Sequence, residues 1–203
     1  MHLKIPLPTL LCCTLLALHC SASNHFAMDT IPYHQIPEYP ENFTPATVAA
    51  RLIDGLGYRF YWATKDLREE DLAYKPSEDS RTISETLRHI YGLSGTTLNA
   101  VLNQPNIRPS KEDDLNFEEL RNHTLENIKQ AADVFRSNPK ADLKNSNIIF
   151  QRGDRTSEFP FWNLLNGPLA DAIYHTGQIV AFRRAAGNPL PPGVNVFSGK
   201  TRE

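Results

Sequence analysis

Four stretches of the chain repeat apolar residues at the spacing of an α-helix. They cover residues 44–66, 82–104, 116–138 and 160–187. Apolar positions three and four residues apart lie on one face of a helix, so each stretch has a face that needs burial. Helices of this kind cover such faces by packing against one another. The sequence therefore predicts an all-α fold, a four-helix bundle, with no second domain.

Capping signals mark where the first three helices begin. Thr44 precedes a proline suited to the first helical position, and Thr82 and Asn116 each stand three residues before a glutamate, as in a capping box. In the last stretch, Gly167 and Pro168 predict a kink or a broken first turn, so we expect the regular helix to begin at Pro168. The apolar face expected on the first helix consists of Val48, Leu52, Leu56, Phe60 and Ala63.

The connecting segments have weaker signals. Residues 106–115 predict a charged loop, and residues 148–161 fit either a small hairpin around a glycine turn or an irregular flap over the end of the bundle. Residues 24–43, rich in proline and tyrosine, predict an extended arm. After the last helix, residues 190–203 predict a tail with a short apolar knot at Val194, Val196 and Phe197.

The N-terminal 23 residues have the pattern of a secretory signal peptide. Lys4 precedes a short apolar run, and small residues follow it at positions 21–23. An alternative is a lipoprotein signal in which Cys20 is acylated and would tie the protein to a membrane. Cys12 and Cys13 lie in the same segment, so the mature chain, residues 24–203, would have no thiol. We expect an exported protein, periplasmic or extracellular.

Composition limits the classes of partner. The formal net charge is −2 at pH 7, and the basic residues do not gather in a patch, which argues against a nucleic-acid partner. With 203 residues, the chain is long enough to bury a core without disulfides or a structural metal. The sequence leaves a homodimer open.

A polar line runs along the mainly apolar last helix. Asp171, His175 and Gln178 are spaced at one and two turns, and a buried carboxylate beside a buried imidazole needs a partner or an ion. Taken alone, Asp171 and His175 also fit an ordinary helical pair. His89 lies at the edge of the apolar stripe of the second helix, where it can reach inward. Helix bundles build metal sites from such inward side chains, so we expect His89, Asp171 and His175 to meet.

These residues also carry a family resemblance. The histidine on the second helix and the run from Asp171 to Gly187, with His175-Thr-Gly-Gln178 inside it, resemble the DinB-like (YfiT-like) four-helix-bundle superfamily. The resemblance covers about residues 44–188. It implies a divalent metal held by one histidine of the second helix and two of the fourth. His89 and His175 match that pattern, and Asp171 replaces the third histidine. A carboxylate can still bind Zn, Ni, Fe or Mn.

The resemblance leaves several activities open, because one fold serves many functions. An exported metal-dependent hydrolase acting on a small molecule is the first hypothesis, because hydrolysis needs only water. The second is a non-catalytic envelope protein that keeps the bundle with a degraded site. The third, a thiol-dependent S-transferase, would require retention in the cytosol, where low-molecular-weight thiols are found. The sequence assigns no catalytic residue beyond the three candidate metal ligands.

Overall fold

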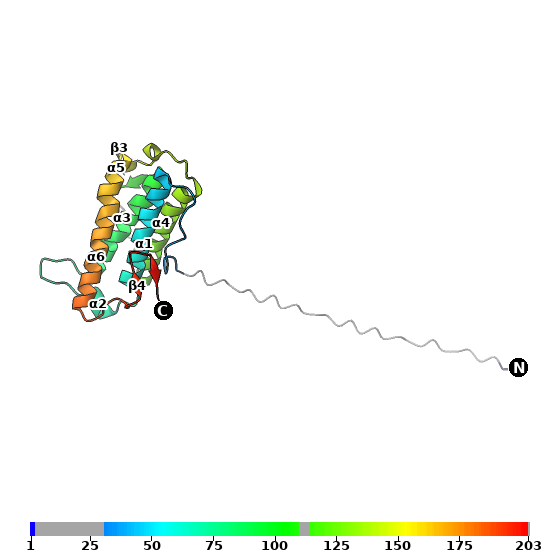
Figure 1. Cartoon of the computed structure of the whole chain (residues 1–203), viewed down its shortest axis with the longest axis horizontal. Helices are drawn as coiled ribbons and strands as arrows, with labels where there is room; N and C mark the ends of the chain where they lie inside the picture. Colours follow the sequence, from blue (N-terminus) through cyan, green and yellow to red (C-terminus); the bar gives the residue numbers. More distant parts are fainter. Residues whose placement is uncertain (3–30, 110–113, 203) are drawn as a thin grey trace. The chain divides into compact units, whose positions relative to one another are not determined.

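Helices dominate the computed structural model of the chain, which describes residues 1–2, 31–109 and 114–202 (Figure 1). The elements all belong to one unit, residues 31–203. The long helices are α1 (Pro45–Thr64), α3 (Ile83–Val101), α4 (Phe117–Ser137) and α6 (Ala170–Ala185). The short helical segments are α2 (Glu69–Ala73), η1 (Leu143–Asn145), α5 (Phe161–Leu164) and the π-helical η2 (Leu165–Leu169). Small sheets accompany them, so the fold is mostly helical rather than purely α.

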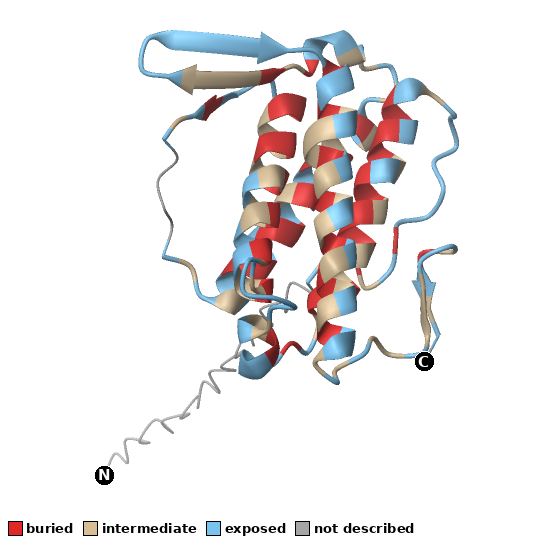
Figure 2. Ribbon diagram, turned by 90° about the vertical axis from the view of Figure 1, so that its left-hand side faces the viewer, coloured by how far each residue is buried: buried red, intermediate tan, exposed pale blue. Residues whose placement is uncertain are grey.

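The long helices pack side by side around one main core. α1 and α3 each contact both α4 and α6. Figure 2 shows the buried residues on the sides of the helices that face one another and the exposed residues on the outer sides. The three predicted caps are present, because the side chains of Thr44, Thr82 and Asn116 each accept from the backbone N–H three residues on. These caps satisfy backbone donors that a helix start leaves free.

The predicted core face of α1 was wrong in its first half. Val48 and Leu52 are 47% and 41% exposed. The residues buried there are Ala46, Ala49, Ala50 and Ile53. Alanine side chains leave room for close packing, so this end of α1 packs through three alanines and Ile53, while Val48 and Leu52 face solvent. The second half, through Leu56, Phe60 and Ala63, packs in the core as predicted.

A three-stranded sheet lies at one end of the helices. Its order is β1 (Pro105–Ile107), β2 (Ile148–Arg152) and β3 (Arg155–Phe159), with β1 parallel to β2 and β3 antiparallel to it. Of the two structures that the sequence left open for residues 148–161, the hairpin is the one present, as β2–β3, and Figure 2 shows its exposed outer strand at the top. The predicted loop at 106–115 was wrong at its start, because β1 occupies residues 105–107. The buried Asn106 fixes this strand by donating to the Ile149 carbonyl (3.0 Å) and accepting from Asn99 (3.0 Å).

The arm is docked on α1 over its described part. The Tyr33 hydroxyl donates to the buried Asp54 (3.0 Å), and the Tyr33 ring lies so close to Gly57 that a Cβ there would come within 2.5 Å of it. The Ile36 N–H donates to the Gly199 carbonyl of the tail (2.9 Å). Glycine at position 57 is thus required by the close approach of the arm.

The tail forms a second small sheet, β4 (Val194–Asn195) paired with β5 (Lys200–Thr201). The predicted apolar knot was wrong, because Val196 is 46% and Phe197 97% exposed and only Val194 packs, against Ile36, Tyr58 and Trp62. A turn this short has no second layer to cover those side chains. The predicted signal peptide, apart from its first two residues, lies outside the described residues. Within the described ranges, no helix has the length and apolar character needed to cross a bilayer.

Candidate metal centre

His89 is supplied by α3. This helix begins at the Thr82 cap and buries Leu87 and Ile90 on either side of His89. The histidine therefore sits where the buried face of α3 meets its solvent face, and its side chain is 33% exposed. As the sequence predicted, it is an edge residue that turns toward the neighbouring helix.

Asp171 and His175 are supplied by the start of α6, just after a break in the chain's last helical stretch. The break is the π-helical η2, in which Gly167 has non-helical angles (φ −96°, ψ −106°) and Pro168 has no N–H to donate. The predicted break at these two residues is confirmed, but regular helix resumes at Ala170 rather than at Pro168 as predicted, because the π-helical segment includes Pro168. Asp171 lies in the first turn of α6, where the positive end of the helix dipole favours a carboxylate.

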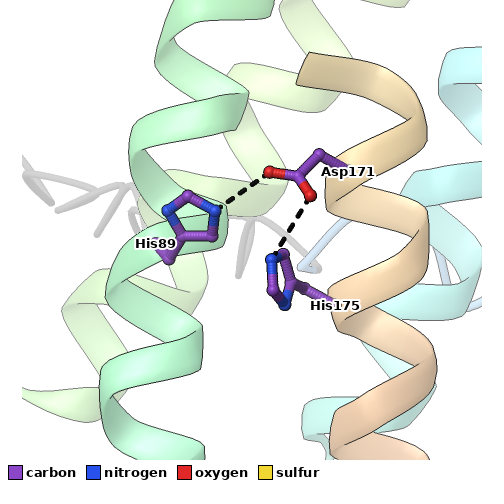
Figure 3. A group of neighbouring side chains, drawn as sticks. All are labelled: His89, Asp171 and His175. Carbon is purple, nitrogen blue, oxygen red and sulfur yellow. Dashed lines mark hydrogen bonds and ion pairs between the residues drawn. The ribbon is translucent and has the colours of Figure 1, made fainter. Parts of the chain in front are cut away.

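The side chains of His89, Asp171 and His175 point toward one another across the gap between α3 and α6 (Figure 3). Nε2 of His89 lies 3.0 Å from Oδ2 of Asp171, and Nε2 of His175 lies 3.3 Å from Oδ1 of Asp171. The two imidazole rings are 4.7 Å apart and nearly perpendicular. Each carboxylate oxygen therefore faces one ring nitrogen, and the three residues meet as the sequence predicted.

The burial of this group differs from the sequence prediction. The His175 side chain is 13% exposed, but that of Asp171 is 42% exposed. The carboxylate sits at the mouth of the group and the imidazole beneath it. The expected buried carboxylate was therefore wrong, and the reason is that the break at η2 opens the surface just before Asp171.

Gln178 sets the orientation of the His175 ring. Oε1 of Gln178 lies 2.6 Å from Nδ1 of His175, and because an amide oxygen only accepts, Nδ1 is the donor. In a neutral ring, the lone pair of Nε2 then points at the Asp171 carboxylate. The lone pair of His175 Nε2 and the Asp171 carboxylate repel each other unless a positive charge lies between them. A divalent cation, or a second proton on the His175 ring, would supply that charge.

The donor set fits a divalent metal. Ligands bound at about 2.0–2.2 Å to one ion lie about 3 Å or more apart, which agrees with the two contacts of Asp171. All three ligand atoms lie within 4.8 Å of one another, and this is the one such group of three among the described residues. Two imidazoles and one carboxylate suit Zn, Fe, Ni or Mn and leave coordination positions open.

An open groove begins at Asp171. It has a volume of about 480 Å³ and runs along η2 and the first turns of α6, with Leu93 of α3 on the other side. Asp171 is the candidate ligand that lines the groove, and Leu93 stands one turn beyond His89 on α3. The sequence did not single out its wall residues, although the Gly167-Pro168 signal marked the place where the surface opens.

The remaining candidates lie elsewhere. His123 is exposed on α4, as predicted. His34 packs against the rings of Tyr61 and Trp62, away from the metal centre, and His25 lies outside the described residues. Tyr174 is 64% exposed, with its ring 5.3 Å from that of His175.

Fold and site together define a mostly helical protein with a candidate His–Asp–His metal centre between two helices. The model of the DinB family matches residues 58–200, and the chain belongs to this family. No curated protein and no solved structure matches the chain.

Proposed function

We propose that the chain is an exported metal-dependent hydrolase built on a four-helix bundle of α1, α3, α4 and α6. The observation that carries this proposal is the convergence of two imidazole nitrogens and a carboxylate at the end of an open groove. A site that binds an ion for structure alone is usually closed, whereas a catalytic one keeps a position open. Here the half-exposed Asp171 leaves that access.

The residues of the candidate centre have two proposed roles, to bind the ion and to orient its ligands. His89, His175 and Asp171 would hold the ion, and Gln178 keeps the His175 ring in the tautomer that presents Nε2. A divalent metal held there lowers the pKa of a coordinated water and polarises a carbonyl group. All three cysteines lie within the first 20 residues, so residues 21–203 provide no thiolate nucleophile. Under this proposal, water is the nucleophile.

The hydrolase proposal is tested by turnover. The chain is purified without a histidine tag, stripped with a chelator, reloaded separately with Zn, Fe, Ni or Mn, and given a panel of esters and amides. We expect hydrolysis that depends on the metal and is lost in His89→Ala. His123→Ala, which removes an exposed histidine of α4, is the matched control. Equal turnover by the stripped chain would contradict the proposal.

A non-catalytic protein with a degraded site is the second candidate. It is favoured by one observation: the 3.0 Å contact between His89 and Asp171 also has the length of an imidazole–carboxylate hydrogen bond, which needs no ion. In that case Asp171→Ala would change stability without changing metal content. A thiol-dependent S-transferase would need the chain to stay in the cytosol.

Export, domain organisation and assembly belong to the same proposal. Residues 1–23 would be the signal peptide, residues 24–43 the arm and residues 44–203 the family domain, with a membrane contact only if Cys20 is lipidated. A small molecule is the proposed substrate, and a homodimer is compatible with it. Intact mass measurement of the protein recovered from cell fractions tests export, since cleavage after Ser23 and acylation of Cys20 give different masses.

A further inference from the structure

The groove beside the candidate metal centre has walls of distinct chemistry. On the side of α3 it is lined by Leu93, and on the other side by Pro168 of η2 and Ala170 of α6. These three residues offer a small apolar surface, in which Leu93 lies one turn after His89, Pro168 lies about one turn before Asp171, and Ala170 directly precedes Asp171. A short alkyl or acyl group fits such a surface, whereas a large aromatic group would find little to cover it.

Hydrogen-bonding groups lie next to that apolar surface. Asn166 is exposed and its amide both donates and accepts. The hydroxyl of Tyr174 does the same from one turn beyond Ala170. This set of donors and acceptors complements an amide or ester.

Charge in the groove argues against an anionic ligand. Its lining residues include neither lysine nor arginine, and Asp171 is the residue among them that is charged at neutral pH. Proteins bind carboxylates and phosphates through guanidinium or ammonium groups, or through a metal. Apart from the proposed ion itself, the groove walls therefore offer an anion no cationic partner, which favours an uncharged molecule.

We propose that this groove takes uncharged carboxamides or esters with a short apolar acyl group, a specificity that rests on the proposed hydrolase function. In the reaction, the oxygen of water forms the new bond to the carbonyl carbon and the C–N or C–O bond breaks. One proton of the water goes to the leaving nitrogen or oxygen, and the other is released as the carboxylic acid ionises. Leu93, Pro168 and Ala170 contact the acyl chain, and Asn166 and Tyr174 are the specificity-determining polar residues.

Binding is measured with butyramide and butyrate, which share a carbon skeleton and differ in charge. The purified chain is treated with a chelator, so that no ion attracts the anion, and each compound is titrated while ¹H–¹⁵N NMR spectra are recorded. We expect butyramide to shift the Asn166 side-chain amide and the Gly167 and Tyr174 backbone amides. Butyrate should bind at least ten-fold more weakly.

Two alanines of α6 provide the matched variants. Ala170→Trp fills the groove, whereas Ala181→Trp adds the same side chain to an exposed position three turns along the helix. The butyramide shifts should disappear in the first variant and remain in the second, and the spectra themselves report whether each variant is folded. Absent shifts, equal binding of butyrate, or shifts that survive Ala170→Trp would overturn the proposal. Because the titration needs no metal and no turnover, its failure is distinct from the failure of the hydrolase proposal.

Discussion

The side-chain oxygen of Gln178 lies 2.6 Å from Nδ1 of His175. This contact joins two residues of one face of α6, three positions apart, and it determines which nitrogen of the imidazole is free. With Nδ1 donating to Gln178, Nε2 is the atom available to an ion, and Nε2 is the atom that faces Asp171. The orientation of a candidate ligand thus depends on a residue that would never touch the metal.

Gln178→Leu removes the acceptor of the His175 proton, so the ring can rotate or change tautomer. We expect metal affinity to fall by about 10–100-fold, the usual effect of losing such a partner. Gln178→Glu restores an acceptor and should recover most of the affinity. Competition against a chromophoric chelator measures both variants. Unchanged affinity in Gln178→Leu would show that the contact does not position the ligand.

A second prediction concerns Asp71, whose side chain is fully buried. The Arg68 guanidinium donates to it through Nε (2.9 Å) and Nη2 (2.8 Å), the Arg68 backbone N–H donates as well (2.9 Å), and so does Asn188 (2.7 Å). Because these bonds favour the ionised form, led by those from the Arg68 side chain, they hold the pKa of the Asp71 carboxyl well below its usual range.

A depressed folded-state pKa means that the unfolded chain binds the proton more tightly. The resulting stabilisation is fully present above the unfolded pKa of about 3.9 and is lost as the pH falls from there toward the lower folded-state pKa. We expect the difference in unfolding free energy between the native chain and Asp71→Asn to be constant near pH 6 and to shrink below about pH 4. Urea titrations at several pH values measure it. A difference that persists unchanged at pH 3 would refute the prediction.

Arg183 supports the end of α1. Its guanidinium Nη1 donates to the carbonyl oxygens of Trp62 (3.0 Å), Ala63 (3.0 Å) and Lys65 (2.9 Å), and the residue is 1% exposed. The last carbonyls of a helix have no partner within the helix, and Arg183 supplies a partner from α6.

Arg183→Ala should lower the free energy of unfolding by about 3 kcal/mol, since each buried carbonyl left without a donor costs roughly 1 kcal/mol or more. The neighbouring Arg184→Ala, at an exposed position, should change it by less than about 0.5 kcal/mol. Urea denaturation of both variants tests the pair. Similar stabilities would mean that solvent can replace Arg183 at the end of α1.

The fold was predictable where local signals and packing agree. The caps at Thr82 and Asn116 and the break at Gly167 act within a few residues of themselves, so the sequence pattern contains them. Val48 and Leu52 were predicted wrongly. Their hydrophobicity alone favours burial, but the packing of the neighbouring helices places alanines on the core face of α1 instead. β1 was missed for a similar reason, since its three residues depend on β2, more than 40 positions away.

The residues of the candidate site could be predicted from the sequence, but the exposure of their side chains to solvent could not. Spacing on one helix places Asp171 and His175 on the same face, and the position of His89 at the edge of its apolar stripe predicts that it turns inward. The exposure of Asp171 depends on the shape of the surface at η2. The spacing of apolar residues along the sequence contains no information on that shape. The groove is formed by two segments far apart in the sequence, Leu93 and residues 166–174. Local sequence patterns could therefore not predict it.

The most direct measurement is the metal content of the tag-free protein by elemental mass spectrometry, beside His89→Ala, Asp171→Ala and the surface control His123→Ala. We expect close to one divalent ion per chain in the native protein and in the control, and loss of the ion in both site variants. A native protein that stays free of metal after incubation with Zn, Fe, Ni and Mn salts, or an Asp171→Ala variant that retains a full complement, would contradict the three-residue centre.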